Sequence, residues 1–456
     1  MTQRVPVPGG RTRRHHVVIV GSGFGGLAAA RRLEHADVDV TLIARTSHHL
    51  FQPLLYQVAT GVISQGQIAP PVRVILRDQR NVTVALGDVE AIDLENRAVT
   101  SRMLERVTTT RYDSLIIAAG AGQSYFGNDH FAEFAPGLKT VDDALELRGR
   151  ILGAFEQAEL STDPIERDRL LTFVVIGAGA TGVEMAGQIA EMAGTTLRGT
   201  FRSIDSTQAR VILLDAAPAV LPPFGERLGS RAEKRLRALG VDVQLGAMVV
   251  DMDYDGLVVR QADGSTRRIE SQCKVWSAGV AASPLGRQLA EQCGVELDRA
   301  GRVRVEPDLT IPGHAEVFVI GDMMAVDGVP GQAPAANQSG RYAADAVVAR
   351  INGTYRDRKP FAYWDKGSMA TVARHCAVAR VPIPGTSRAV EFSGFFAWLG
   401  WLFLHLLYLV GFRNRFITFI DWTLAFTSRN RHQLAVTEQQ VFARAAIDRL
   451  SHDLAA

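Results

Sequence analysis

Two glycine-rich stretches of this sequence have residue types and spacing that suit a nucleotide phosphate. One runs from Gly21 to Gly26 and the other from Gly177 to Gly182, and each has the pattern G-x-G-x-x-G. The first glycine permits a tight turn, the second lets a pyrophosphate reach backbone N–H groups, and the third lets helix and strand pack closely. One copy alone could be a packing turn, but two copies in a strand–turn–helix context predict two dinucleotide sites.

The residue that ends the next strand distinguishes the two sites. After the second motif it is Asp215, whose carboxylate can accept a hydrogen bond from a ribose 2′-OH and repel a 2′-phosphate. This favours NADH over NADPH, unless Asp215 is only an exposed strand end. After the first motif come Ala44 and Arg45, and Arg45 could lie against an adenine ring or reach a phosphate. We therefore expect a tightly held FAD at the first site and exchanging NADH at the second.

A further acidic residue, Asp322, ends the strand-like run "VFVIGD". A carboxylate at a strand end beside a helix start can hold a polyol hydroxyl, such as one of the flavin ribityl chain. It can also act as a helix N-cap for the following turn. The two readings are compatible.

The segments around both motifs alternate as in a doubly wound sheet. Around the first motif they are Val17–Val20, Gly25–Leu33, Val38–Ile43, Val82–Leu86 and Tyr112–Ala118. Around the second they are Leu171–Met192, Ala209–Ala217 and Cys273–Gly279, with a helix-like segment later at Asn337–Arg350. The pattern predicts an α/β protein with two Rossmann-like dinucleotide-binding domains.

The composition limits the number of domains and the kinds of ligand that we expect. The 456 residues, 47% of them hydrophobic, are enough for two or three domains with full cores. The formal net charge of +2 gives no global electrostatic case for nucleic acid. Cys273, Cys293 and Cys376 are far apart and form no CxxC or metal-type cluster, so we expect neither a disulfide framework nor a metal site.

Both ends of the chain leave alternatives open. The basic stretch over 1–14 is either a disordered tail or a weak contact for an anionic membrane face. The apolar run Phe392–Phe412 could span a bilayer, lie at its interface as a helix pair, or be buried core. Trp398, Trp401 and Tyr408 are aromatic residues of the kind found at membrane interfaces.

Four longer stretches resemble one family of flavoproteins. They are "HHLFQPLLYQVATG" (His48–Gly61), "GAGATGVEMAGQI" (Gly177–Ile189), "DKGSMATV" (Asp365–Val372) and "HLLYLVGFRNR" (His405–Arg415). With the two glycine motifs, they resemble the type II NADH dehydrogenases, above all the mycobacterial type. These are single-subunit, non-proton-pumping NADH:quinone oxidoreductases of respiratory membranes.

The resemblance implies one non-covalent FAD, hydride transfer from NADH to flavin N5, and two-electron reduction of a membrane quinone, here menaquinone, to quinol. It also implies a homodimer that docks monotopically, with C-terminal helices in one leaflet at the cytoplasmic face of the inner membrane. Arg413, Arg415, Arg429 and Arg431 would then meet anionic lipid head groups.

Functional positions of the family can be carried over by motif. For FAD they are Gly21, Ser22, Gly23, Phe24, Gly25, Gly26, Ala44, Arg45, Gln52, Val89, Ala119, Gly120, Asp322, Ala333, Pro334 and Lys366. For NADH they are Gly177, Gly179, Thr181, Gly182, Glu184, Asp215, Ala278 and Gly279, and for quinone they are Gln338 and Lys366. The resemblance makes Glu184 and Lys366 the catalytic residues, although Glu184 could instead be a glutamate on a helix surface.

One segment departs from the family pattern. The family often has Ala-Gln-x-Ala-x-Gln near the flavin and quinone, whereas Pro334 here replaces the first glutamine and Gln338 keeps the second. Proline has no N–H to donate, but its carbonyl can still contact FAD. We therefore expect no side-chain contact from this first position to quinone.

The expected domains are a basic tail over 1–14, an FAD-binding domain over 15–128 and 299–385, an NADH-binding domain over 129–298, and membrane-docking helices over 386–456. Related disulfide reductases and sulfide:quinone oxidoreductases need cysteines beside the flavin, and Arg45–Gly61 contains none. The alternative function is an NADH-responsive flavoprotein that binds a partner, of the apoptosis-inducing-factor type. Such a sensor would not need the C-terminal apolar region.

Overall fold

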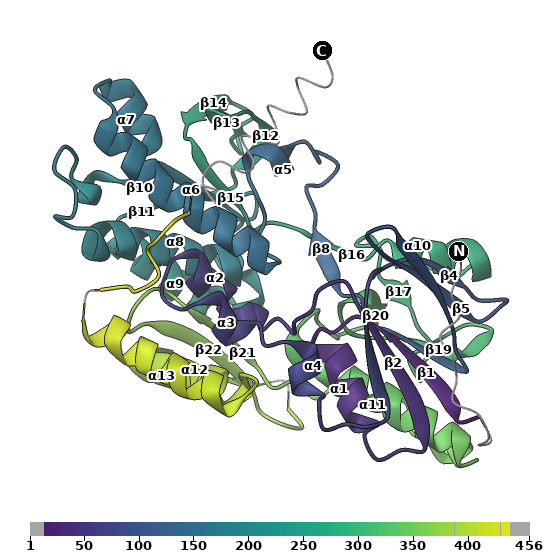
Figure 1. The fold of residues 1–456 in the computed structure, drawn as a ribbon. Helices are drawn as coiled ribbons and strands as arrows, with labels where there is room; N and C mark the ends of the chain where they lie inside the picture. The colour runs from purple at the N-terminus through teal and green to yellow at the C-terminus, as the bar shows by residue number, and fades with distance from the viewer. Residues whose placement is uncertain (1–12, 387, 429, 438–456) are drawn as a thin grey trace. The chain divides into compact units, whose positions relative to one another are not determined.

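The computed structural model of the protein describes residues 13–386, 388–428 and 430–437, which form two compact units (Figure 1). Of these residues, unit 1 takes in 13–50, 70–122 and 280–366, and unit 2 takes in 51–69, 123–279 and 367–437. The units divide at other residues than the predicted domains, since 51–69 and 367–385 belong to unit 2 and 280–298 to unit 1. Most of the predicted tail over 1–14 lies outside the described residues.

Unit 1 is built on a six-stranded sheet in the order β18-β19-β7-β1-β2-β3. Its strands are β1 (His15–Val20), β2 (Val38–Ala44), β3 (Val82–Leu86), β7 (Ser114–Ile117), β18 (Thr310–Ile311) and β19 (His314–Val319). β1 runs parallel to β2 and β7, with Val17 opposite Val40 and Ser114. Helix α1 (Phe24–Arg32) connects β1 to β2, so the predicted strand–turn–helix–strand unit is confirmed.

The other elements of unit 1 surround this sheet. They are β4 (Asp88–Asp93), β5 (Ala98–Met103), β6 (Arg106–Arg111), β17 (Val303–Arg304), β20 (Met324–Ala325), α4 (Val72–Ile75), α10 (Leu285–Cys293) and α11 (Ala333–Ile351). Two short strands, β8 (Ala121–Gln123) and β16 (Val280–Ala282), lie where the chain passes from one unit to the other.

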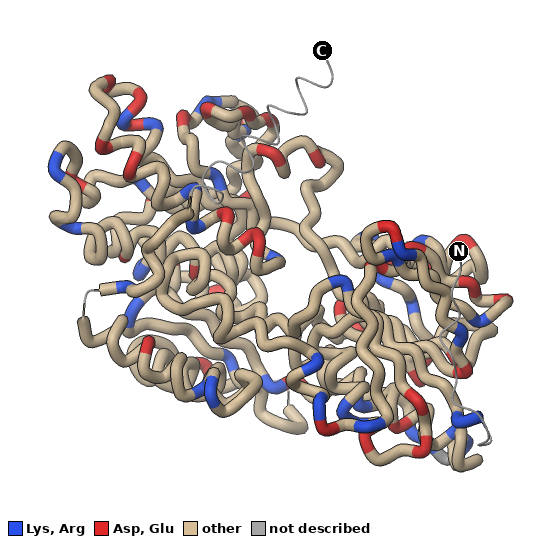
Figure 2. The backbone as a smooth tube through the Cα atoms, in the orientation of Figure 1, with Lys and Arg blue, Asp and Glu red and all other residues tan. Residues whose placement is uncertain are grey.

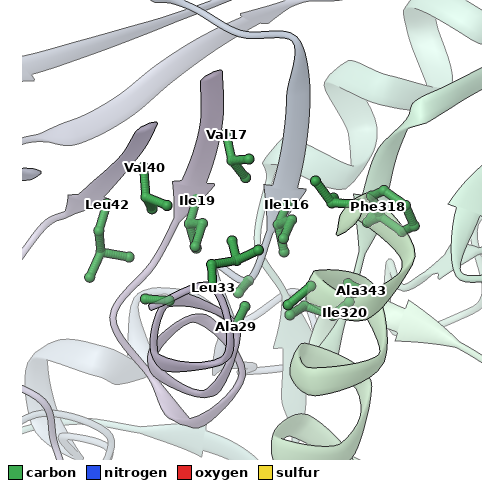
Figure 3. Close-up of a cluster of buried hydrophobic side chains, with 14 of the residues drawn as sticks. Val17, Ile19, Ala29, Leu33, Val40, Leu42, Ile116, Phe318, Ile320 and Ala343 are labelled. Carbon is green, nitrogen blue, oxygen red and sulfur yellow. The ribbon is translucent and has the colours of Figure 1, made fainter. Parts of the chain in front are cut away.

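The apolar run of β1 lies at the centre of unit 1. All four residues of Val17–Val20 are buried, as expected for a central parallel strand covered on both faces. Figure 3 shows one face, where Ile19 and Ile116 of the sheet lie against Leu33 at the end of α1 and Ala343 of α11. This packing fixes where α1 and α11 begin relative to the strand ends.

Unit 2 contains a four-stranded parallel sheet in the order β11-β10-β9-β15. Its strands are β9 (Thr172–Ile176), β10 (Arg210–Asp215), β11 (Val241–Leu245) and β15 (Cys273–Trp276). The helices of this part are α5 (Phe131–Phe134), α6 (Val141–Leu160), α7 (Pro164–Leu170), α8 (Ala180–Glu191) and α9 (Glu226–Ala238). Every residue of β9 is buried, and α8 follows it, so the second predicted strand–turn–helix is also confirmed.

The remaining elements of unit 2 are short helices, antiparallel strands and a C-terminal helix pair. They are α2 (Leu55–Ala59), α3 (Gln65–Ile68), β12 (Met248–Met252), β13 (Gly256–Arg260), β14 (Thr266–Glu270), β21 (Ser368–Thr371), β22 (Ala377–Pro382), β23 (Ala389–Gly394), α12 (Phe395–Tyr408) and α13 (Phe412–Thr427).

The C-terminal apolar run Phe392–Phe412 is not one continuous helix. It contains the end of β23, the 14 residues of α12 and the first residue of α13. In the described part of the chain, no helix is both long and apolar enough to cross a membrane. Trp398 and Trp401 are buried, so these two are core residues of unit 2 and not interface aromatics, whereas Tyr408 is exposed.

Helices α1 and α11 of unit 1 approach closely through small residues. A Cβ added at Gly340 of α11 would lie 2.2 Å from the carbonyl oxygen of Gly25 in α1. One added at Gly25 would lie 3.2 Å from the carbonyl oxygen of Ala336. Gly25 belongs to the first glycine motif, so this contact supports the turn. The neighbouring atoms are backbone, which cannot move aside as the end of a long side chain can.

We expect Gly340→Ala to destabilise the protein by about 1–3 kcal/mol, because the backbone clash outweighs the roughly 1 kcal/mol that alanine gains over glycine in a helix. Thermal unfolding of the purified protein measures the effect. Arg341→Ala, at an exposed position of the same helix, is the control and should unfold near the wild-type temperature. Equal or higher stability of Gly340→Ala would contradict the tight crossing.

Candidate functional site

The first glycine turn joins β1 to α1 in unit 1, and its geometry fits a bound pyrophosphate. Gly21 has a φ of +102°, and a Cβ there would lie 2.3 Å from the carbonyl oxygen of Ala118. A Cβ at Gly26 would lie 1.8 Å from the carbonyl oxygen of Gly21, whereas no described atom lies within 4 Å of one at Gly23. The space at Gly23 adjoins the N-terminus of α1, whose backbone N–H groups attract a phosphate.

A buried histidine, whose role the sequence did not reveal, supports this turn. The Nδ1 of His49 lies 2.8 Å from the carbonyl oxygen of Ser22, and the Ser22 hydroxyl donates to the carbonyl oxygen of His48 at 3.3 Å. The ring of Phe24 meets that of His49 edge to face at 5.2 Å. Burial lowers the pKa of His49, which favours the neutral ring. No local pattern distinguishes His49 from His48, because only the return of the chain after β2 brings it to the turn.

The other FAD candidates of unit 1 mostly follow strands at the carboxyl edge of the sheet, where ligands of open α/β sheets bind. They are Ala44 and Arg45 at the end of β2, Ala119 and Gly120 after β7, Asp322 after β19, and Ala333 and Pro334 at the start of α11. Val89 lies apart in β4, with its side chain packed on an apolar cluster that includes Val20.

Asp322 lies in a 3-10 turn, Gly321–Met323, directly after β19. A Cβ at Gly331 would lie 3.5 Å from its Oδ1 atom, so the carboxylate faces the chain just before α11. The N-cap position of this turn is Ile320, and that of α11 is Gln332. Its contact with a flavin hydroxyl remains a prediction.

Gln338, a candidate quinone contact on α11, is bonded to the backbone of unit 1. Its side-chain amide donates to the carbonyl oxygen of Trp364 at 2.9 Å and accepts from the N–H of the same residue at 2.9 Å. Lys366 follows two residues later, with its Nζ 5.7 Å from the centre of the Trp364 ring. Gln338 therefore positions the segment that carries Lys366, a role that the sequence did not predict.

The second glycine turn, between β9 and α8 of unit 2, repeats the first. Gly177 has a φ of +107°, and a Cβ there would lie 2.7 Å from the backbone nitrogen of Ala278. A Cβ at Gly182 would lie 1.8 Å from the carbonyl oxygen of Gly177, and one at Gly179 meets no described atom within 4 Å. Gly279, with a φ of +74°, follows Ala278. Five of the predicted NADH residues thus come together.

Asp215 is tied into this turn. One carboxylate oxygen accepts from the N–H of Ala178 between the first two motif glycines, and the other accepts from the N–H of Ala217 at 2.7 Å. The side chain is half-buried, which corrects the alternative of an exposed strand end. Each oxygen keeps a second lone pair, so the carboxylate can still accept from a ribose hydroxyl.

A cavity of about 90 Å³ in unit 2 brings together residues predicted for FAD and for NADH. Its walls are Gln52, Pro53, Leu55, Tyr56, Leu138, Lys139, Thr181 and Glu184. Thr181 and Glu184 come from the start of α8, and Gln52 precedes α2. The amide of Gln52 donates to the carbonyl oxygen of Lys139 at 3.1 Å, which links two walls of the cavity.

Glu184 is buried in this cavity wall, so it is not the surface glutamate that the sequence left open. Burial raises its pKa to about 8, while hydrogen bonds from Thr371 partly oppose the shift. The N–H of Thr371 donates to Glu184 Oε1 at 3.1 Å, and its hydroxyl lies 3.5 Å from the same oxygen. A carboxyl that titrates near neutral pH can both give and take a proton under working conditions.

Tyr56 and Thr371 surround Glu184 but were not predicted as site residues. The Tyr56 hydroxyl lies 2.9 Å from the Thr371 hydroxyl, and burial raises the pKa of Tyr56. Both belong to stretches that carry the family resemblance, "HHLFQPLLYQVATG" and "DKGSMATV". Neither has a spacing that indicates chemistry, so the sequence alone offered no reason to choose them.

Arg431 does not lie where the sequence placed it. It is buried in unit 2, where it donates to the carbonyl oxygen of Thr60 at 2.6 Å and to Gln188 Oε1 at 3.0 Å. The expectation that Arg431 meets lipid head groups is therefore wrong, because its guanidinium group is buried and hydrogen-bonded within unit 2. Arg429 lies outside the described residues.

In the part of the chain that the structure describes, no group of three or more His, Cys, Asp or Glu side chains could hold a metal ion. All three cysteines are free, with Cys273 buried and the other two half-buried.

Comparisons with known proteins identify the family of this chain. Residues 15–340 match the family described as pyridine nucleotide-disulphide oxidoreductase, which, with the two glycine turns, defines the class as oxidoreductases with two dinucleotide-binding domains. The chain is 64% identical over 440 residues to the type II NADH:quinone oxidoreductase Ndh of Mycobacterium tuberculosis, covering 96% of this chain and 94% of that protein. It is 61% identical over 434 residues to NdhA of the same organism, covering 94% and 91%. The chain belongs to the type II NADH:quinone oxidoreductases.

Solved structures show the same fold at low sequence identity. The NDH2 of Plasmodium falciparum in complex with NADH has a TM-score of 0.84 at 19% identity, covering 91% of this chain and 98% of that one. The sulfide:quinone oxidoreductase of Aquifex aeolicus has a TM-score of 0.67 at 18% identity, covering 94% of each chain. The predicted fold class and family are thus confirmed, and the matches favour the enzyme over the partner-binding sensor.

The raised pKa of Glu184 predicts a pH-dependent stability difference. The folded protein holds this proton up to about pH 8, whereas an exposed carboxyl loses it near 4.5, so the wild type loses stability as the pH rises through this window. Glu184→Gln has no such loss. We expect its unfolding temperature, relative to the wild type, to increase from pH 5 to pH 9. A constant difference across these pH values would contradict the buried carboxyl.

Proposed function

We propose that this type II NADH:quinone oxidoreductase holds one non-covalent FAD on unit 1, takes NADH on unit 2 and reduces menaquinone without pumping protons. The observation that carries the proposal is Glu184, a buried carboxyl with a pKa near neutrality in the cavity beside the second glycine turn. A proton-exchanging group is what the reduction of a quinone to a quinol requires.

The residues of unit 1 fit FAD. The open space at Gly23 accepts a pyrophosphate, and no acid follows β2 to select an exchanging NAD ribose. Asp322 lies at the same sheet edge and would hold a ribityl hydroxyl, while Arg45, which is exposed, is free to lie along the adenosine half. When bound, the flavin supplies the chemistry that passes two electrons from NADH to quinone.

The residues of unit 2 select NADH. Asp215 is held by two backbone N–H groups, so its carboxylate cannot swing away from the ribose that occupies this strand end. Its negative charge repels a 2′-phosphate, and NADPH is therefore the poorer substrate.

In the proposed reaction, Glu184 exchanges a proton and Lys366 stabilises negative charge. Glu184 donates a proton during quinone reduction and regains it from solvent, which its pKa of about 8 permits near neutral pH. Lys366, an exposed cation, stabilises negative charge on the reduced flavin or on a quinone oxygen.

This assignment predicts that Glu184→Gln slows quinone reduction by about 100-fold and slows flavin reduction by NADH much less, because only the former consumes the proton. Anaerobic stopped-flow absorbance measures the two half-reactions separately, with menadione as the acceptor. Yellow, FAD-loaded protein is required for both measurements. If Glu184→Gln leaves both half-reactions unchanged, the residue has no proton role.

The C-terminal helix pair provides a membrane-docking surface, proposed for the cytoplasmic face. α12 has no Lys, Arg, Asp or Glu and is tan along its whole length in Figure 2. Its exposed large apolar side chains are Phe395, Phe396, Leu399, Phe403, Leu404, Leu407 and Tyr408, and those of α13 are Phe412, Phe416, Phe419, Ile420 and Leu424. Arg413 and Arg415 at the start of α13 would meet anionic head groups. We also propose a homodimer, from the family resemblance alone.

Docking through this surface predicts that Phe403→Asp weakens binding to vesicles made of phosphatidylglycerol and phosphatidylcholine, because Phe403 is 66% exposed and a buried charge is costly in lipid. Flotation of the holoenzyme with vesicles measures binding. Leu160→Asp, at a residue of α6 that is 82% exposed, is the matched control and should float like the wild type. Equal loss in both variants would argue against α12 as the docking element.

A further inference from the structure

A chain of buried hydrogen bonds runs from α13 to Glu184 within unit 2. The indole nitrogen of Trp422 lies 2.7 Å from Gln57 Oε1, and Gln57 Nε2 lies 3.1 Å from the Tyr56 hydroxyl. The Tyr56 hydroxyl lies 2.9 Å from that of Thr371, which lies 3.5 Å from Glu184 Oε1. All five residues of this path are buried, and hydrogen bonds are stronger in such surroundings than in water.

The direction of donation along this chain is fixed at its far end. An indole N–H can only donate, so the atom of Gln57 that faces Trp422 must be the oxygen, and the nitrogen must face Tyr56. The Tyr56 oxygen therefore accepts from Gln57, and its own hydrogen is left for Thr371. The Thr371 oxygen accepts this hydrogen bond from Tyr56. The hydrogen of the Thr371 hydroxyl is therefore directed to Glu184.

We propose that Trp422, Gln57 and Tyr56 are positioning residues, which orient the Thr371 hydroxyl so that it donates to the Glu184 carboxylate. The proton affinity of Glu184 is thereby set from α13, the helix that the proposed function places at the membrane. The inference rests on that function for its catalytic meaning, but the hydrogen-bond geometry stands without it.

The ionised form of Glu184 suits only one direction of the chain, whereas the neutral form suits either, because a neutral carboxyl can accept through its carbonyl oxygen or donate through its hydroxyl. A carboxylate can only accept, which suits the direction that Trp422 imposes. In the reversed chain, a protonated Glu184 donates to Thr371, Thr371 to Tyr56, and Tyr56 to the oxygen of a flipped Gln57. Trp422 forbids that reversal because its N–H would then face the amide N–H₂ of Gln57. Removing the indole N–H therefore makes a second arrangement available to the neutral form alone and raises the pKa of Glu184.

The charged side chains near Glu184 are not members of this chain of hydrogen bonds. Lys139 lines the same cavity, and Glu191, farther along α8, is paired with Arg374 at 3.1 Å and with Arg431 at 3.8 Å. Tyr56 itself is neutral, since burial raises its pKa. A pKa change in a Trp422 variant therefore reports the chain and not a rearranged ion pair.

The test is an infrared titration of the Glu184 carboxyl band in the FAD-loaded enzyme, assigned by subtracting the spectrum of Glu184→Gln. We expect Trp422→Phe to raise the pKa of Glu184 by about one unit, a tenfold change in proton affinity. Trp398→Phe is the matched control, because Trp398 is also a buried tryptophan of the helix pair but has no indole hydrogen bond within the described residues. It should leave the pKa unchanged.

Cutting the chain separates positioning from general packing. Tyr56→Phe removes the link between Gln57 and Thr371, so Trp422→Phe added to Tyr56→Phe should cause no further pKa change. A shift of the same size in both backgrounds would overturn the proposal, as would no shift in folded Trp422→Phe. If Trp422→Phe does not hold FAD, Gln57→Leu takes its place and should also raise the pKa.

Different measurements test the proposed proton role of Glu184 and the proposed chain of hydrogen bonds, so one proposal can be refuted without the other. Unchanged half-reactions in Glu184→Gln would remove the proton role of Glu184 and leave the infrared result standing. An unshifted carboxyl band in the Trp422 and Gln57 variants would refute the chain and leave the stopped-flow result standing.

Discussion

Both nucleotide sites depend on one close approach, that of a helix start to the strand end before it. A Cβ at Gly26 or at Gly182 would lie 1.8 Å from the carbonyl oxygen of the glycine that opens each turn. No side chain can occupy that space, so backbone N–H groups are the nearest polar atoms to any bound phosphate. Because this geometry is the same in both units, the difference between the sites comes from their surroundings. Asp215 belongs to one turn, while Arg45 follows the other strand.

Helix α8 carries two buried glutamates, one with a structural role and one suited to a chemical role. Glu191 pairs with Arg374 and Arg431, which compensates its charge and ties the segment after α13 to the helix. Glu184 has no ion pair within the described part of unit 2, and burial raises its pKa, although hydrogen bonds from Thr371 partly oppose the shift. The same helix thus holds one glutamate in ion pairs with two arginines and one glutamate suited to proton exchange.

Much of the fold can be predicted from the sequence, because the patterns that indicate its strands, turns and helices are local. The apolar runs before Gly21 and Gly177 and the spacing of the glycines predict each strand–turn–helix directly. The site is only partly predictable, because His49, Tyr56 and Thr371 reach their partners through the path of the chain and not through any spacing. The prediction for Arg431 is wrong because a basic residue after an apolar helix is typical of contact with lipid head groups. Only the structure shows that this residue is buried and binds protein atoms.

The binding of Asp215 to the turn has a consequence for how coenzyme preference can change. Its carboxylate accepts from the N–H of Ala178 inside the glycine motif, so the residue that we propose discriminates between coenzymes also braces the loop that we propose binds their phosphates. A neutral or basic replacement would remove the repulsion of a 2′-phosphate and loosen the loop at the same time. Evolution towards NADPH would therefore need a compensating change in the turn, and the two properties are inherited as a pair.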